Sequence, residues 1–185
     1  AHGADLARGD DKGLTPMHVA ISGYDETFDT FIEAVLASAV DLRPLVNAAG
    51  ELGITPLQQA TAYGSERMVQ WLLDMGADPA APGDHNSTLP SYALETWKII
   101  DETTMMHKDM VEGIRMIDIL LDGGLDVDTP GRNGRTALGF ACDAERRDFI
   151  GFIVSRGADP ARASEECEPY LDFIRRVKTV AEGRF

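Results

Sequence analysis

The chain has no run of about eighteen apolar residues, the length that a membrane-spanning helix requires. Its longest apolar stretch, residues 31–40, is interrupted by Glu33, so the sequence excludes a transmembrane helix. Residues 1–5 also lack the basic and apolar regions that begin a secretory signal peptide.

Cysteine is equally scarce, since Cys142 and Cys167 are the two in the chain and neither lies in a CxxC pattern. Two cysteines do not make the disulfide framework of a small secreted domain, so the sequence predicts a reducing, cytoplasmic location. We expect Cys142, beside Ala141, to be a buried packing residue with an inert thiol. Cys167 lies between Glu166 and Glu168, whose charges would raise the pKa of its thiol.

Basic residues are few relative to acidic ones. The 185 residues include 17 Lys and Arg against 31 Asp and Glu, a formal net charge of −14. This charge opposes both nucleic acid binding and attraction to an anionic membrane surface. It favours a partner protein with a basic patch, through steering of the encounter more than through affinity.

What the chain does contain is repetition. A motif of Thr followed by Pro or Ala and a mostly apolar run occupies residues 14–20, 54–60 and 135–141. A second motif, Gly-Ala-Asp, occupies residues 3–5, 76–78 and 157–159, with Gly-Leu-Asp at 124–126 as a variant. Thr55 to Thr88 and Gly124 to Gly157 are each thirty-three residues apart. The two motifs therefore recur in a fixed register.

Each unit of this repeat predicts a pair of helices. The Thr hydroxyl caps the first helix, and Pro is favoured at its first position. The second helix has apolar residues at positions i, i+1, i+4 and i+5, which bury one helical face. These are Met68, Val69, Leu72 and Leu73, then Met116, Ile117, Leu120 and Leu121, then Phe149, Ile150, Ile153 and Val154. A Gly after each stripe predicts a left-handed helix end.

The pattern resembles the ankyrin repeat, whose signature includes Thr-Pro-Leu-His and whose period is 33 residues. The resemblance implies an all-α fold, an α-solenoid of stacked helix pairs joined by β-hairpin-like turns. The expected array spans residues 1–162, with the tail of a truncated repeat over 1–12 and repeats starting near residues 13, 53, 86 and 134. Because the first residues resemble a repeat's tail, we expect further helices upstream.

Two segments depart from the period. The third repeat has an insertion near residues 97–111, and residues 97–110 contain no Gly or Pro, so we expect it to lengthen both helices. It is either a partner contact or a tolerated surface elaboration. Residues 163–185 predict a C-terminal capping helix, amphipathic over 165–182. Its expected inward residues are Tyr170, Leu171, Ile174 and Val177.

No arrangement of residues suggests catalysis, a metal or a cofactor. The chain has no GxSxG, no phosphate-binding glycine loop and no HExxH. The resemblance gives His18, fourth in the opening motif, a structural hydrogen-bonding role. His2, His85 and His107 have no second His or Cys at a metal-ligand spacing. The sequence therefore predicts a protein that is not an enzyme and holds no cofactor.

The resemblance instead implies a concave partner-binding surface, formed by the turn tips and the ends of the first helices. The contact residues expected from the register are Asp11, Lys12, Glu51, Leu52, Tyr63, Asp84, His85, Glu95, Trp97, Arg132, Asn133, Arg135 and Asp143. Tyr63 is the leading anchor, because aromatic residues are enriched at binding hot spots, and Trp97 and Leu52 follow. Trp71, within a second-helix stripe, is expected in the core. Arg132 and Arg135 make the fourth repeat's tip locally basic.

The sequence thus predicts a monomeric, non-enzymatic module that binds another protein. Two narrower functions stay open. One is an acidic inhibitor or immunity-type protein that neutralises a basic enzyme or toxin. The other is a recruiting or regulatory module of a larger protein.

Overall fold

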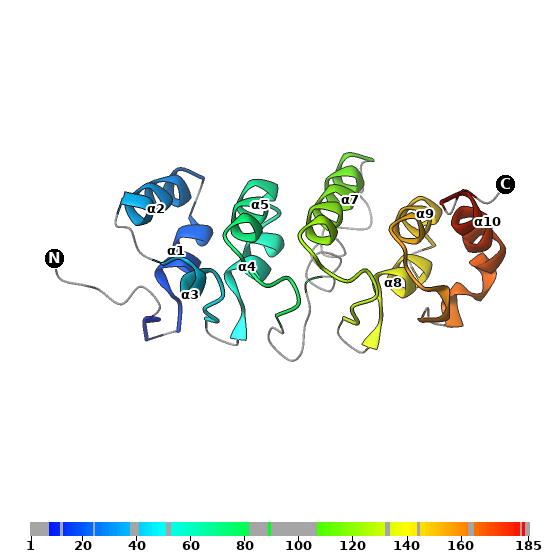
Figure 1. Cartoon of the computed structure of the whole chain (residues 1–185), viewed down its shortest axis with the longest axis horizontal. Helices are drawn as coiled ribbons and strands as arrows, with labels where there is room; N and C mark the ends of the chain where they lie inside the picture. Colours follow the sequence, from blue (N-terminus) through cyan, green and yellow to red (C-terminus); the bar gives the residue numbers. More distant parts are fainter. Residues whose placement is uncertain are drawn as a thin grey trace. The chain divides into compact units, whose positions relative to one another are not determined.

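A computed structural model describes residues 8–11, 13–23, 25–37, 41–50, 53–81, 89, 107–131, 134–143, 145–162, 165–181 and 183. The chain forms two compact units, residues 1–87 and residues 88–185. The regular structure within the described ranges is helical (Figure 1), and the predicted all-α fold class is confirmed. No helix among these residues is both long enough and apolar enough to span a membrane.

Unit 1, residues 1–87, is built from two helix pairs and a short connecting helix. Its helices are α1 (Pro16–Ser22), α2 (Asp25–Ala37), α3 (Arg43–Val46), α4 (Pro56–Ala62) and α5 (Glu66–Asp74). Helix α1 packs against α2, α4 packs against α5, and the two pairs meet through α1 and α4 (Figure 1). Large apolar side chains fill the space between the helices, including Met17, Ile21, Phe28, Leu57 and Leu72.

The stripe predicted for the second helix of the second repeat faces this core. Met68, Val69 and Leu72 of α5 are buried, while Leu73 is half-buried. Trp71 is half-buried and meets the Phe28 ring edge-on, with ring centroids 5.6 Å apart. The stripe prediction for α5 is confirmed in three of its four residues.

The Thr of the opening motif precedes α1, α4 and α8, but its hydroxyl is used in two ways. In α4, Thr55 and Gln58 form a capping box: Thr55 Oγ1 accepts from the Gln58 amide at 3.3 Å, and Gln58 Oε1 accepts from the Thr55 amide at 2.9 Å. The predicted cap is wrong for Thr15. Its hydroxyl lies 2.7 Å from Nδ1 of His18 because the imidazole, three residues on, folds back over the helix start.

A tight turn leads into each of the described opening motifs. In the first turn the Asp10 amide donates to the Leu14 carbonyl at 3.0 Å, and the Gly13 amide donates to the Asp10 carbonyl at 2.9 Å. The same two bonds close the turns over residues 50–54 and 131–135. The residue before the last in each turn has a positive φ, a conformation that favours glycine. It is Gly13 (74°), Gly53 (76°) or Gly134 (73°). These turns are the β-hairpin-like connections that the resemblance implied.

The Asp of the second motif organises the loop after each second helix. Asp78 Oδ1 accepts a hydrogen bond from the Ala80 amide at 2.8 Å. The Oδ1 atoms of Asp41, Asp126 and Asp159 likewise each accept a hydrogen bond from the amide two residues on. The acidic charge at these four landmarks therefore has a structural role, because each carboxylate holds a turn of its own backbone.

Unit 2, residues 88–185, contains the second helix of the third repeat, both helices of the fourth repeat and a C-terminal element. Its helices are α7 (His107–Asp122), α8 (Ala137–Asp143), α9 (Arg147–Ser155), η4 (Pro160–Arg162), η5 (Glu165–Tyr170) and α10 (Leu171–Ala181). Helix α8 packs against α9 and η5, and α10 packs against α9 and η5. The predicted stripe of α9 is fully buried, and that of α7 is buried except for the half-buried Leu121.

Helix α7 has 16 residues, whereas α5 and α9 have nine each. Residues 107–111 of α7 fall within the insertion near residues 97–111, and the expectation that this insertion lengthens both helices stays a prediction. Residues 82–88 and 90–106, which include most of the third repeat's first half, lie outside the described residues.

The single amphipathic helix expected over residues 165–182 is divided in two. Residues 165–170 form the 3₁₀ helix η5, and α10 begins at Leu171. Pro169 lies inside η5 and has no amide hydrogen to donate to the carbonyl four residues earlier, so an α-helix cannot run through it unbroken. Ile174 is fully buried as expected, while Tyr170, Leu171 and Val177 are half-buried.

The two cysteines form a disulfide, which corrects the prediction of two separate thiols. Cys142 of α8 and Cys167 of η5 have Cα atoms 5.1 Å apart and a sequence separation of 25, and both residues are buried. The sequence conceals this pair because their proximity arises only when η5 folds against α8. The cysteines therefore do not indicate a reducing compartment.

Candidate partner-binding surface

Four of the thirteen predicted contact residues lie within the described part of the chain: Asp11, Tyr63, Arg135 and Asp143. The first two belong to unit 1 and the last two to unit 2. The other nine lie outside the described residues, and they are Lys12, Glu51, Leu52, Asp84, His85, Glu95, Trp97, Arg132 and Asn133.

Tyr63 stands at the C-terminal end of α4, where its amide donates to the Gln59 carbonyl at 3.0 Å. The next residue, Gly64, has φ of 72°, so the chain turns away from the helix axis directly after Tyr63. The Tyr63 side chain is thereby left in solvent, and the residue is 61% exposed. An exposed aromatic ring with a polar hydroxyl is a residue type that protein interfaces favour.

Asp11 occupies the tip of the first turn and is exposed. Its neighbour Asp10 has a structural role, because Asp10 Oδ1 accepts a hydrogen bond from the Leu14 amide at 2.9 Å. Two adjacent carboxylates therefore differ in use: Asp10 holds the turn, and Asp11 lies at the solvent-facing tip.

Arg135 and Asp143 form an ion pair between the residue before Thr136 and the last residue of α8. Their side chains are 44% and 23% exposed, so the pair lies at the surface. The positive charge of Arg135 therefore has a carboxylate beside it, and the fourth repeat's tip is less basic than the sequence suggested. An exposed pair of this kind adds little stability, so a partner could exchange it at low cost.

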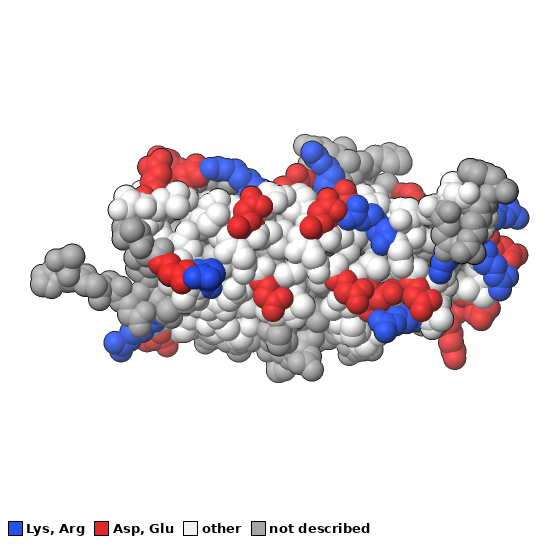
Figure 2. Space-filling view, in the orientation of Figure 1, with Lys and Arg blue, Asp and Glu red and all other residues white. Residues whose placement is uncertain are grey.

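Charges on the second helices are also paired. In unit 1, Arg67 of α5 forms a bidentate ion pair with Asp29 of α2, with 3.1 Å between Nη1 and Oδ2. In unit 2, Arg156 bonds Asp118 of α7 at 3.1 Å and also Asp122. On the face drawn in Figure 2, acidic and basic side chains are interspersed among the coloured residues, without a broad basic area.

His18 links the two helix pairs of unit 1 and is 1% exposed. Its Nε2 lies 2.9 Å from the Ile54 carbonyl oxygen, which can only accept, so Nε2 carries the hydrogen. Nδ1 is then free to accept from the Thr15 hydroxyl. Burial lowers the pKa of His18, although the bond to Ile54 opposes this effect, so the ring is neutral near pH 7. The structural role expected for His18 is confirmed.

The second repeat continues the same set of links with glutamines. Gln58, at the motif position of His18, donates from Nε2 to the Ala81 carbonyl at 2.9 Å. Gln59 reaches back to the first repeat, donating to Ser22 Oγ at 2.6 Å and to the His18 carbonyl at 3.2 Å. The first helices of unit 1 are therefore fixed to each other by polar contacts, which makes the exposed side of α4 a preformed surface.

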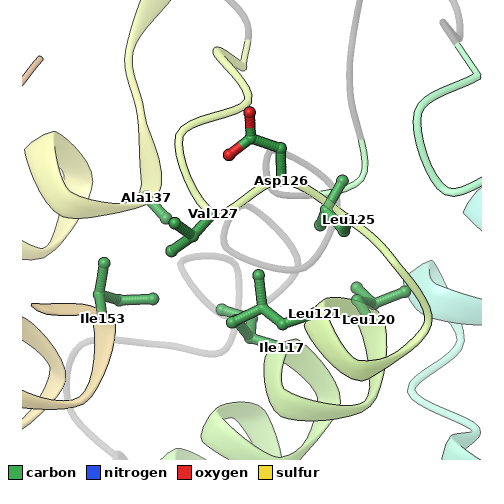
Figure 3. A pocket seen from close by; sticks show the side chains of 8 residues that line it. All are labelled: Ile117, Leu120, Leu121, Leu125, Asp126, Val127, Ala137 and Ile153. Atoms are coloured by element: carbon green, nitrogen blue, oxygen red, sulfur yellow. The ribbon is translucent and has the colours of Figure 1, made fainter. Parts of the chain in front are cut away.

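The cavities in the described residues do not suggest a small-molecule site. In unit 2, α7 approaches α8 and α9 around a space of about 10 Å³ that is lined mainly by apolar side chains, and the Asp126 carboxylate points away from them (Figure 3). That volume is about one water molecule in size. No group of three His, Cys, Asp or Glu within the described ranges could hold a metal ion.

A larger depression of about 670 Å³ opens on unit 1 beside α1 and α2, with Leu14, Pro16, Val19 and Phe31 in its lining. Val19, which is 52% exposed, has the motif position that Gln59 has in α4. Gln59 contacts the preceding helix pair, so its position in the repeat belongs to a face on which repeats stack. The depression lies on the equivalent face of the first repeat, which explains its apolar lining.

Comparison with known protein families identifies these repeats. Residues 1–83 match the family model described as ankyrin repeats (3 copies). This match lies within unit 1, and it confirms the resemblance to ankyrin repeats drawn from the motifs.

Similar proteins are longer than this chain. It is 28% identical over 166 residues to the B-cell lymphoma 3 protein of Homo sapiens, a match that covers 84% of this chain and 32% of that protein. It is 29% identical over 105 residues to the ankyrin repeat protein FPV115 of fowlpox virus (strain NVSL), covering 50% and 19% respectively. It is 34% identical over 89 residues to the palmitoyltransferase AKR1 of Lachancea kluyveri, covering 48% and 11%.

The chain therefore spans about a third or less of the length of these relatives. Ankyrin repeats generally mediate protein–protein interaction, and the family is typically non-enzymatic.

Proposed function

We propose that this chain binds a partner protein through the concave ankyrin surface, with Tyr63 as the anchor in the second repeat. The observation that carries the proposal is a large, 61% exposed aromatic side chain at the end of a first helix that is itself fixed by hydrogen bonds. A rigid platform loses little conformational entropy on binding, so most of the contact energy of the ring is available for affinity. No catalytic step is part of the proposed function.

Leu36 of α2 provides a matched comparison. It is 60% exposed and lies in unit 1 like Tyr63, but it belongs to the second helix of its pair and not to a first helix. Capture from a cell extract with immobilised wild-type chain, Tyr63→Ala and Leu36→Ala, followed by mass spectrometry, tests the proposal. The proteins retained by the wild type and by Leu36→Ala should be lost with Tyr63→Ala. Loss with Leu36→Ala alone would place the binding surface elsewhere.

A second candidate function is inhibition of a basic enzyme or toxin, which the formal net charge of −14 favours. Exposed carboxylates such as Asp11 would then steer a cationic partner towards the turn tips. The two functions differ in their response to salt. Association with a basic target slows steeply as ionic strength rises. Binding dominated by Tyr63 lacks this steep dependence of the association rate, and removal of the ring changes mainly the dissociation rate.

A further inference from the structure

The C-terminal element of unit 2 covers the last helix pair, and its attachment differs from that of a repeat. The element, here called the C-terminal cap, comprises η5 and α10, residues 165–181. Helix η5 packs on α8, while α10 packs on α9. The cap therefore touches both helices of the fourth repeat from one side of the chain.

The non-covalent attachment of α10 is thin. Of its eleven residues only Ile174 is buried, whereas the nine-residue α5 buries three. Phe173 adds a half-buried ring that lies over Gly151 of α9, where a Cβ would come within 3.6 Å of it. The ion pair between Arg175 and Asp172 joins two residues of α10 itself and so does not attach the helix to α9.

The disulfide supplies the covalent part of the attachment. Cys142 and Cys167 are 2% and 1% exposed, so both sulfur atoms lie inside the contact between α8 and η5. A thiol reagent can reach them only when η5 moves away from α8. Reduction and release of the C-terminal cap are therefore coupled. Movement of the cap exposes the disulfide to the reductant, and reduction removes the bond that holds the cap.

We propose that the Cys142–Cys167 disulfide is a redox-controlled latch that holds the C-terminal cap on the fourth repeat. A thiolate of a dithiol reductant attacks one sulfur, breaks the S–S bond, forms a mixed disulfide and releases the other cysteine as a thiolate. The second thiolate of the reductant then breaks the mixed disulfide, forms a disulfide within the reductant and releases the remaining cysteine. Two electrons pass to the protein, and two cysteine thiols result. In the reduced chain the cap separates from α8 and α9 and exposes the faces it covered. The proposal does not depend on the partner-binding surface of unit 1.

Limited trypsin digestion of the full chain, with and without a dithiol reductant, tests this latch. Arg175, Arg176 and Lys178 are exposed in α10, yet cleavage of a helix requires local unfolding. Arg67 in α5 is the internal control because it lies in the other unit. Reduction should accelerate cleavage in α10 about tenfold or more and leave the rate at Arg67 unchanged.

A Cys142→Ser/Cys167→Ser double variant should be cleaved in α10 at the reduced rate without reductant and should not respond to it. Should this variant fail to fold, the wild-type comparison still decides. Three results would overturn the proposal: free thiols in the chain purified without reductant, equal α10 cleavage in both states, or equal acceleration at Arg67, which would indicate global unfolding.

Discussion

The two units attach neighbouring elements by different chemistry and from different positions of the repeat. In unit 1 the fourth residue of the opening motif is His18 or Gln58, and its side chain bonds a carbonyl of the following loop. In the fourth repeat, which belongs to unit 2, that position is Gly139, which has no side chain to reach across. Cys142, one turn further along α8, instead forms the disulfide to η5.

The difference follows from what lies next along the chain. The second repeat presents a hairpin-like turn in which the Ile54 carbonyl also accepts from the Gly50 amide, so the neutral His18 side chain is an adequate link to it. The C-terminal cap begins with a 3₁₀ helix that contains Pro169, and α10 buries a single residue. A covalent bond compensates for this smaller contact, because it limits the freedom of the unfolded chain instead of requiring more buried surface.

The largest effect should come from removing this bond. We expect Cys142→Ala/Cys167→Ala to lower the free energy of unfolding of unit 2 by about 3 kcal/mol, from the loop closed by a disulfide of this separation. Urea unfolding under oxidising conditions measures it. Reduced wild-type chain should match the variant, and an unchanged midpoint would show that the junction does not depend on the disulfide.

A smaller effect should follow from removing the cap of α4. Thr55→Ala leaves the Gln58 amide without its acceptor and should cost about 1 kcal/mol, whereas Thr55→Ser keeps the hydroxyl and should cost less. Urea titrations of the two variants against wild type give the difference. Equal stability of the Ala and Ser variants would contradict the role of the capping box.

The hydrogen bond from His18 to the Ile54 carbonyl in unit 1 should make stability depend on pH, whereas the disulfide of unit 2 should not. Burial lowers the pKa of His18 below its unfolded value of about 6.5, so the unfolded chain binds the proton more readily. The stabilisation is complete above about pH 6.5 and is lost as the pH falls towards the folded pKa. His18→Gln, which copies Gln58, should keep the bond and remove this loss. Parallel stability–pH curves for the two proteins between about pH 7 and pH 5 would contradict the assignment.

The periodic features of the fold could be predicted because each depends on local chemistry that repeats. The apolar stripes of α5, α7 and α9 and the glycines after them follow from helical spacing and from the left-handed cap, with φ of 88°, 99° and 98° at Gly76, Gly124 and Gly157. The exposure of Tyr63 also follows from register, while its part in binding stays a prediction.

The features that could not be predicted depend on contacts between segments. The Cys142–Cys167 pair requires that η5 fold onto α8, and the ion pair of Arg135 with Asp143 requires the turn and α8 to bring their ends together. The hydroxyl of Thr15 could cap the helix or bond His18, and burial of the imidazole decides between them. Pro169 was visible in the sequence as the signal that the C-terminal helix would be interrupted.

The affinity of a captured partner for the Tyr63→Ala and Leu36→Ala variants measures whether Tyr63 anchors the partner. Both side chains are about equally exposed, at 61% and 60%, so neither truncation should alter the unfolding midpoint appreciably. We expect a loss of affinity of about tenfold or more for Tyr63→Ala, and wild-type affinity for Leu36→Ala. Unchanged affinity for Tyr63→Ala would contradict the assignment of the binding surface.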